Sequence, residues 1–245
     1  MADLRIGTAT VPPNFSELKL GSENIQKVYS GSTLVWPIVD PSDETIPFTS
    51  FCNLDFTMEN STRTLLQDGS TIPIVTTGAQ WNNYLYLNQP AAVWWQYNSS
   101  NSNRGLFYNR FAFDGNNPIQ PPSGWRIPTK ADYNTLITSP CNTSAPNQNV
   151  YGANTGLWDM TLLTNTTGLG DSGFNANGYG HVIYYTSTGN LGFIFEGTYS
   201  FFGIQLASNP TLYTFIFDVI QANNLSANFA GTTYQNSGYN LRFCR

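Results

Sequence analysis

Charged side chains are scarce in this sequence. Lysine, arginine, aspartate and glutamate together make up 10% of its 245 residues, whereas aromatic residues reach 15%. The formal net charge is −5, and the ten basic residues are scattered without a run. A nucleic-acid partner is therefore not expected, because there is no basic field to displace counterions from phosphates. Uncharged hydrogen-bonding groups and aromatic rings in place of charge are typical of extracellular proteins and virion surfaces.

Cysteine and histidine are also rare, with three cysteines (Cys52, Cys141 and Cys244) and a single histidine, His181. The sequence has no Cys-x-x-Cys pair and no cysteine–histidine cluster, which argues against a structural zinc site. A Cys52–Cys244 disulfide would join the start of the C-terminal domain to its end. Three buried free thiols account for the odd number of cysteines equally well.

Long apolar runs are absent. No stretch reaches the ~18 apolar residues that a membrane-spanning helix needs. The start of the chain, Met1–Arg5, lacks the apolar region of a secretory signal. We therefore expect either a trimmed mature chain or a protein that leaves its cell by another route, such as a virion released by lysis.

The N-terminal residues are expected to form a small β module. Leu18–Leu20 begins it, and Ile25–Tyr29 and Thr33–Trp36 flank a Ser-Gly-Ser hairpin signal. Such a unit is too small to be stable alone, so a partner is expected. Residues 18–37 resemble a segment found in many tailed-phage structural proteins. This resemblance implies attachment to other virion proteins.

A linker separates this module from the rest of the chain. Residues 37–47 hold three prolines and three acidic residues, which favour an extended segment over a helix or a central strand. The sequence therefore predicts two parts: an attachment segment and linker at 1–45, and a larger domain at 50–245.

One helix is clearly predicted in the larger domain. Thr129 has the side chain of an N-cap, and Asp132 answers it three residues later as a capping-box acid would. The apolar face of this helix, at helical spacing, comprises Tyr133, Leu136 and Ile137. A second, weaker helix is predicted within 156–163. Short strands broken by glycine and asparagine make up the remainder, so we predict an α+β domain with a high loop content.

Six short motifs occur in a fixed order through this domain. They are Met58-Glu59-Asn60, Asp68–Pro73, Gly105–Ala112 (GLFYNRFA), Pro122–Thr129 (PSGWRIPT), Asp171–Ala176 (DSGFNA) and Gly238–Cys244 (GYNLRFC). In this order they resemble the Fibrobacter succinogenes major paralogous domain. That family is a branch of the C-type-lectin-like and formylglycine-generating-enzyme-like fold.

The resemblance covers roughly residues 50–245 and implies a C-type-lectin-like fold. It also implies structural roles for the motif residues Trp125, Arg126, Pro128, Phe174 and Arg242. Two departures change the polar contacts of the presented face. The family's aromatic pair is replaced here by Arg110-Phe111, and its serine-rich region by Tyr199–Gly203.

Candidate catalytic groups are few. The formylglycine-generating relatives use a closely placed cysteine pair, which this chain lacks. A Ser-His-Asp triad would have to use His181, and no Gly-x-Ser-x-Gly motif accompanies it. The alternative of a glycoside-hydrolysing carboxylate pair stays open for Asp159, Asp171, Glu196 and Asp218. No catalytic residue and no cofactor are expected.

Calcium is the one metal that the sequence leaves open. The Glu-Pro-Asn and Gln-Pro-Asp tripeptides of calcium-dependent lectins are absent. Asp114–Asn117 (DGNN) offers oxygen ligands, but the glutamate that an EF-hand loop needs is missing. This stretch is interpreted as a turn. A structural cation held by loop carbonyls remains an alternative, and no metal-binding residue is assigned.

Tyrosine, asparagine and serine crowd the last quarter of the chain. This mixture is the chemistry of adaptable recognition surfaces, because a rigid amphipathic ring lies beside flexible hydrogen-bonding groups. The predicted ligand-binding residues are Tyr184, Tyr199, Tyr234, Asn236 and Tyr239. Trp94 and Trp95 are adjacent, so in a strand at most one of them lies in the core.

The sequence as a whole predicts a virion protein, on a phage tail fibre or baseplate, that binds a host surface glycan or protein without catalysis. Membrane insertion is not expected, whereas a homo-oligomer, trimeric on a tail fibre, would multiply a weak single-site affinity. Two alternatives stay open. One is a purely structural part of the baseplate, collar or capsid, and the other is a glycan-degrading enzyme on the same scaffold.

Overall fold

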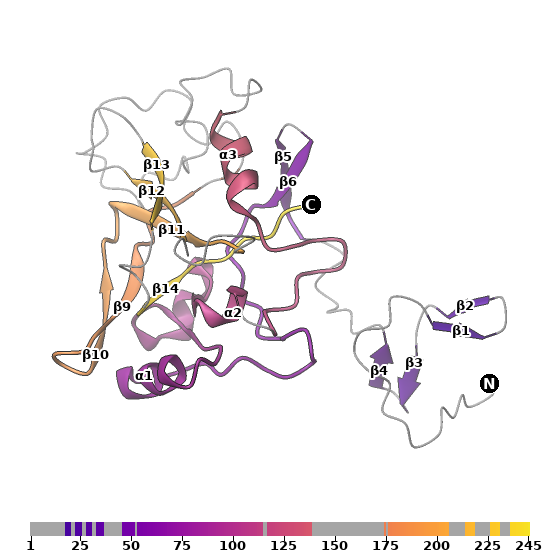
Figure 1. Cartoon of the computed structure of the whole chain (residues 1–245), viewed down its shortest axis with the longest axis horizontal. Helices are drawn as coiled ribbons and strands as arrows, with labels where there is room; N and C mark the ends of the chain where they lie inside the picture. Colours follow the sequence, from indigo (N-terminus) through magenta and orange to yellow (C-terminus); the bar gives the residue numbers. More distant parts are fainter. Residues whose placement is uncertain are drawn as a thin grey trace.

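The structure is a computed structural model of the chain (Figure 1). It describes residues 18–20, 23–25, 28–30, 33–36, 46–51, 53–114, 117–138, 174, 176–205, 214–218, 226–230 and 236–245. The predicted helix within 156–163 lies outside these residues.

Helices and antiparallel strands are mixed in the part of residues 50–245 that is described, so this part is α+β, as predicted. The helices are α1 (Gly78–Tyr86), α2 (Phe111–Asp114) and α3 (Lys130–Thr138), with 3-10 turns η2 (Trp95–Tyr97) and η3 (Ser99–Arg104). The strands are β5 (Phe48–Phe51), β6 (Leu54–Thr57), β7 (Ala92–Val93), β8 (Phe107–Asn109), β9 (His181–Tyr185), β10 (Asn190–Ile194), β11 (Tyr199–Gly203), β12 (Thr214–Asp218), β13 (Ser226–Ala230) and β14 (Ser237–Tyr239). Among the described helices, none has the length and apolar character that crossing a membrane requires.

The N-terminal segment contains two short hairpins. Its strands are β1 (Leu18–Leu20), β2 (Glu23–Ile25), β3 (Val28–Ser30) and β4 (Thr33–Trp36). The pairing of β3 with β4 confirms the predicted Ser-Gly-Ser hairpin. The prediction of one strand over Ile25–Tyr29 is wrong, because Ile25 pairs back onto Leu18 in β2 and Val28 begins a separate strand.

Strand β14 occupies the middle of a five-stranded sheet. The strand order is β10-β9-β14-β8-β7, and all four pairings are antiparallel. The last strand of the chain therefore separates β8 from β9. Figure 1 shows β14, in yellow, next to β9. A second sheet has the order β11-β12-β13, and it is joined to β14 by a bridge between Phe202 and Asn240. The two halves of the five-stranded sheet, β10-β9 and β8-β7, are therefore joined only when β14 is paired between them.

The five-stranded sheet buries a separate hydrophobic core on each face. Successive side chains of a strand point to opposite faces. In β8, Phe107 accordingly packs in a cluster with Trp81 of α1, whereas Tyr108 packs in a cluster with Trp125. Helix α1 covers the first face, over β9 and β10. The high aromatic content of the chain thus supplies two cores.

Only one of the two adjacent tryptophans, Trp95, is a buried core residue. Trp95 is buried in the cluster that contains Phe107, and Trp94 packs, partly buried, against the other cluster. The expectation that at most one of them is a core residue is therefore confirmed. The two residues do not lie together in a strand, because Trp95 begins a 3-10 turn.

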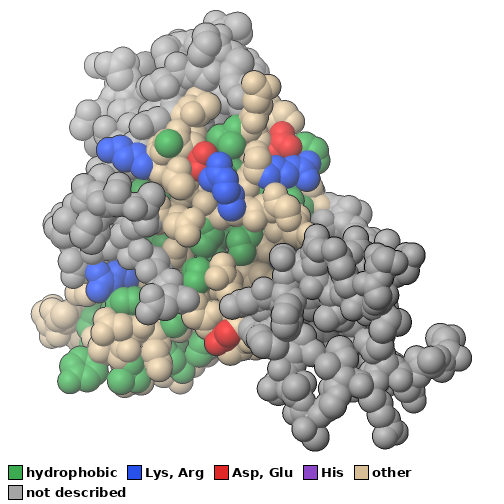
Figure 2. All heavy atoms as spheres, turned by 45° about the vertical axis from the view of Figure 1, so that its right-hand side comes forward, with side chains coloured by type: hydrophobic (Ala, Val, Ile, Leu, Met, Phe, Trp, Pro, Cys, Tyr) green, Lys and Arg blue, Asp and Glu red, His purple; other side chains and the backbone are tan. Residues whose placement is uncertain are grey.

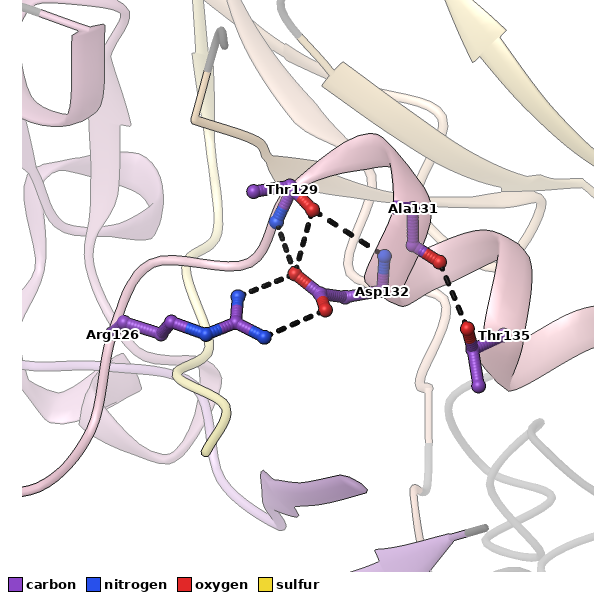
Figure 3. Close-up of polar contacts among 5 residues, drawn as sticks. All are labelled: Arg126, Thr129, Ala131, Asp132 and Thr135. Atoms are coloured by element: carbon purple, nitrogen blue, oxygen red, sulfur yellow. Dashed lines mark hydrogen bonds and ion pairs between the residues drawn. The ribbon is translucent and has the colours of Figure 1, made fainter. Parts of the chain in front are cut away.

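Helix α3 begins with the predicted capping box (Figure 3). Thr129 Oγ1 accepts from the Asp132 backbone N–H at 3.4 Å, and Asp132 Oδ2 accepts from the Thr129 N–H at 2.7 Å. Arg126 donates to both carboxylate oxygens, at 2.5 and 2.7 Å. Burial alone would raise the pKa of Asp132, but the hydrogen bonds from Arg126 and Thr129 outweigh it and lower that pKa. The Gly-Trp-Arg-Ile-Pro-Thr motif therefore fixes the start of the helix.

After β14 the chain runs on between elements that come much earlier in the sequence. The Phe243 carbonyl accepts from the Thr57 N–H at 3.0 Å, and Cys244 exchanges backbone hydrogen bonds of 2.8 and 2.9 Å with Arg126. The Cys244 thiol is buried and free, and burial raises its pKa to about 12. Of the two alternatives for this cysteine, the free thiol is the one found. Cys52 lies outside the described residues.

The charged guanidinium of Arg242 is buried inside the domain. Its side chain is buried, and its Nε donates to Asn60 Oδ1 at 2.9 Å. Its Nη1 donates to the carbonyls of Phe174 and Thr57. Its Cζ lies 4.4 Å from the Phe174 ring and 5.2 Å from the Phe202 ring. Burial lowers the pKa of Arg242 to about 10, so the guanidinium still carries its charge at neutral pH.

His181, at the start of β9, is also buried. Its ring lies 4.2 Å from that of Phe201 and 5.5 Å from that of Phe195, between centroids. Burial lowers the pKa of His181 to about 3, because the charged imidazolium is disfavoured in this apolar setting. The imidazole is therefore neutral in the folded protein at any pH above about 4.

We predict that Arg242→Lys lowers the free energy of unfolding by about 3 kcal/mol. An ammonium group cannot stack on two rings, and the Asn60 oxygen loses its donor. Arg245→Lys is the matched control on the same terminal segment, since the Arg245 side chain is 41% exposed, and its effect is expected to stay below about 1 kcal/mol. Urea unfolding of both variants measures this. Equal losses would contradict the role given to Arg242.

A second prediction concerns pH. The pKa of His181 in the folded protein lies below the unfolded value of ~6.5. The contribution of His181 to stability is therefore fully present above pH ~7 and is lost as the pH falls toward 3. The free energy of unfolding should fall by about 2 kcal/mol between pH 6.5 and 4.5. No other histidine contributes, because the chain has only one. In His181→Gln most of this slope should disappear, and a slope equal to that of the parent protein would refute the assignment.

Candidate functional site

Arg104, the last residue of η3, lies between two aromatic rings. Its Cζ is 5.0 Å from the Trp95 centroid and 5.5 Å from the Tyr179 centroid. Its Nη2 donates to Oε1 of Glu196. The Glu196 side chain is 48% exposed, against 16% for Arg104. Because the guanidinium is planar, stacking between two rings fixes its orientation. The Arg104 guanidinium is therefore largely buried, while the Glu196 carboxylate paired with it is exposed to solvent.

The backbone of Arg104 is held by the buried network around Arg242. The Arg104 carbonyl accepts from Asn60 Nδ2 at 2.9 Å and from Asn240 Nδ2 at 3.0 Å. Asn60 is also the residue that accepts from Arg242 Nε. The next residue, Gly105, has φ +73°, and a Cβ there would lie 2.5 Å from the Asn60 Cβ. Only glycine lets the two segments approach in this way.

A second glycine brings Glu196 to Arg104. Gly180, just before β9, donates its N–H to the Tyr199 carbonyl at 2.8 Å. It has φ +68°, and a Cβ there would lie 2.1 Å from the Ile194 carbonyl oxygen. The end of β10 therefore passes directly over the glycine backbone, and Glu196 follows at the position where it meets Arg104.

Three residues near this ion pair have left-handed backbone conformations. They are Gln96 (φ 52°), Tyr97 (φ 58°) and Phe195 (φ 62°). For a bulky side chain this conformation costs roughly 1–2 kcal/mol. Burial does not offset it fully, since the Tyr97 and Phe195 side chains remain 36% and 43% exposed. Strain of this kind, held by the surrounding structure, is a feature of functional sites.

One series of aromatic rings leads from the surface to Arg104, and a separate ring contact lies beside Glu196 in the chain. The Tyr97 ring packs on Phe193 at 5.2 Å between centroids, and Phe193 packs on Trp95 at 5.3 Å. Phe195 packs on Tyr199 at 4.9 Å. Partial burial raises the pKa of Tyr97, so its hydroxyl keeps its proton at neutral pH. We call the residues Trp95, Tyr97, Arg104, Asn177, Tyr179, Phe195 and Glu196 the Arg104 site.

Two buried polar atoms of the Arg104 site lack a hydrogen bond within the described part of the chain. They are Nη1 of Arg104, a donor, and Oδ1 of Asn177, an acceptor. Both lie near Tyr179, whose hydroxyl is 3.4 Å from Asn177 Nδ2 and over whose ring Arg104 stacks. An unsatisfied buried polar group costs about 1–3 kcal/mol.

The four predicted ligand-binding residues that the structure describes do not form one surface, since Tyr239 is buried. The Tyr184 N–H donates to the Asn236 carbonyl at 3.1 Å, so these two are neighbours, with Asn236 exposed and Tyr184 half-buried. Tyr199 is half-buried and borders the Arg104 site through its contact with the Phe195 ring. Tyr234 lies outside the described residues.

The prediction that Tyr239 lies on the surface is wrong. Its side chain is fully buried, with Phe113 and Phe201 at 6.2 and 6.3 Å between ring centroids. The reason is its place in β14, the central strand of the sheet, both faces of which are covered by cores. Tyr239 cannot contact a ligand without unfolding that strand.

The motif residues fall in two places. Trp125 and Pro128 are buried beside the start of α3, and Arg126 is exposed and pairs with Asp132. Phe174 and Arg242 stack on one another in the buried network. All five therefore contact residues that position elements of the fold, and none of them is a member of the Arg104 site.

The candidate catalytic groups do not come together in the described residues. His181 is buried with a pKa of about 3, and Glu196 is paired with Arg104. The remaining carboxylates that the sequence left open, Asp159, Asp171 and the side chain of Asp218, lie outside the part of the chain that is described.

The candidate calcium stretch is described only in part. Asn117 Oδ1 accepts from the Asp68 N–H at 3.0 Å, while residues 115–116 lie outside the description. Among the described residues, no group of three or more histidine, cysteine, aspartate or glutamate side chains is placed to hold a metal ion.

Sequence reasoning missed Arg104 and Tyr97, and it considered Glu196 only as a carboxylate for hydrolysis. Arg104 and Glu196 are 92 positions apart, and no local pattern joins them. A signal was available in Gly105, which follows Arg104 and begins the GLFYNRFA motif. A glycine after a run of polar residues indicates a fixed turn, and this one orients the arginine.

Comparison with known proteins identifies the family. The model of the Fibrobacter succinogenes major domain matches residues 52–243, which is most of the chain. Among curated proteins no match was found, and no solved structure matches either. The matched range includes Asn60, Gly105 and Arg242, which hold the buried network together. The chain belongs to the Fibrobacter succinogenes major domain family.

Proposed function

We propose that residues 50–245 form a non-enzymatic recognition domain that binds a bacterial surface glycan through the Arg104 site. In this proposal the domain has a C-type-lectin-like fold, and residues 1–45 attach it to a phage tail fibre or baseplate. The observation that carries the proposal is the Arg104–Glu196 ion pair, together with two exposed rings on left-handed backbone close to it in the chain. Phe195 precedes Glu196, and Tyr97 lies two residues after Trp95, on which Arg104 stacks. Exposed rings next to paired hydrogen-bonding groups suit the apolar faces and hydroxyl edges of sugars.

The surface charges support an uncharged partner. Arg126 pairs with Asp132 at 2.5 Å, and Arg245 pairs with Asp55 at 2.9 Å. Figure 2 shows basic and acidic side chains beside one another on the face it draws, among uncharged and apolar ones. In the described part of this face, charges of one sign do not form the extended field that a polyanionic ligand requires.

The geometry of the chain ends supports attachment through the N-terminal segment. Asp55 and Arg245 exchange backbone hydrogen bonds of 2.9 and 3.0 Å, so the beginning and the end of the domain lie side by side. Strands β1–β4 pair only among themselves in the described part of the chain, as two-stranded hairpins. An isolated two-stranded hairpin is marginally stable, which favours a partner chain. Oligomerisation there would raise the avidity of a weak glycan site.

The test is titration of the labelled protein onto a panel of intact bacterial cells and onto polysaccharide extracted from them. Saturable binding is expected, and Tyr97→Ala or Phe195→Ala should each weaken it about tenfold, because each removes a stacking ring. Tyr86→Ala is the matched control, since Tyr86 is 83% exposed and lies outside the Arg104 site, and it should leave binding unchanged.

Other results would contradict the proposal. A protein that binds no cell and no polysaccharide, yet associates tightly with other virion proteins, is a structural component. Shortening of the polysaccharide during the titration would identify an enzyme. Loss of binding in the presence of a chelator would add a calcium ion to the site.

A further inference from the structure

We infer that the ligand of the Arg104 site is an uncharged sugar, held through adjacent hydroxyl groups, and not an acidic sugar. This inference rests on the recognition function proposed above and assigns the chemical class of the ligand. It follows from the charge of the site, from the hydrogen-bonding groups that remain free there, and from the rigidity of Arg104.

The charge of Arg104 is already neutralised. Its Nη2 donates to Glu196, and the pair has no net charge. A ligand carboxylate that approached the guanidinium would meet Glu196 first, because Glu196 is the more exposed partner. The net charge of −5 on the whole chain adds a weaker repulsion. An acidic sugar is therefore disfavoured at this site, whereas an uncharged one is not.

The free hydrogen-bonding capacity suits hydroxyl groups. Only Oε1 of Glu196 is used by Arg104, and within the described residues Oε2 has no partner. A sugar hydroxyl can donate to Oε2 of Glu196 while its neighbour accepts from Arg104, whose side chain is 16% exposed.

The site is rigid before the ligand arrives. Trp95 and Tyr179, which enclose the guanidinium, are both buried, and the Arg104 carbonyl is fixed by two asparagines. Little side-chain entropy remains to be lost on binding, which matters for a ligand that forms few contacts. The rings of Tyr97 and Phe195 at the edge can stack on the apolar face of a pyranose.

The sign of the effect of Glu196→Gln tests the inference. The probes are immobilised dextran, mannan and galactan, which are uncharged, and alginate and polygalacturonate, which are acidic. For an uncharged ligand, Glu196→Gln removes a charged acceptor and should weaken binding about tenfold or more. For an acidic ligand the same change removes repulsion and frees the guanidinium, so binding should tighten.

Two controls accompany this measurement. Glu59→Gln removes an exposed carboxylate outside the Arg104 site and should leave binding unchanged. Raising the salt concentration from 50 to 500 mM should alter binding of an uncharged sugar less than about twofold, whereas binding of a polyanion would fall severalfold.

The outcomes separate the inference from the proposed function. Binding of an uncharged polysaccharide that Glu196→Gln weakens supports both. Binding of alginate or polygalacturonate, or tighter binding by Glu196→Gln, overturns the inference and leaves recognition intact. Binding to cells that no polysaccharide reproduces also overturns it and indicates a protein ligand. No binding to any cell or polysaccharide overturns the proposed function and the inference together.

Discussion

The fold of this domain depends on a guanidinium buried at its centre. A charge removed from water is destabilising by several kcal/mol unless its surroundings compensate. For Arg242, compensation comes from the Asn60 amide oxygen, from backbone carbonyls and from the stacked Phe174 ring. Asn60 links Arg242 to the Arg104 site, because its amide nitrogen donates to the Arg104 carbonyl. One cation thus joins segments from the beginning, middle and end of the domain.

This arrangement has a consequence for folding. Arg242 and Asn60 are 182 positions apart, and the strand that precedes Arg242 lies in the centre of the five-stranded sheet. Contacts at such sequence separation pay the entropy of closing a long loop before they stabilise anything. Folding of the domain should therefore be limited by insertion of residues 236–245, after the hairpin of β9 and β10 has formed locally.

The sequence predicted the features that local patterns encode. The helix cap at Thr129 and Asp132 and the hairpin of β3 and β4 follow from short-range chemistry. The order of the motifs predicted the family, and the structure shows that three of these motifs meet in space, because Asn60 contacts both Gly105 and Arg242. Tyr239 was misplaced because its position depends on the strand order. The pairing of Arg104 with Glu196 was missed for the same reason.

Structure and recognition are linked in this account through Asn60, which is buried and outside the Arg104 site yet bonds to both arginines. The most direct test is the affinity of Asn60→Ala for the polysaccharide or cells that the parent protein binds, measured where urea unfolding shows the variant to be folded. The account predicts binding about tenfold weaker, because Arg104 loses a donor that fixes its backbone. An affinity equal to that of the parent protein would contradict the claim that the buried network positions the site.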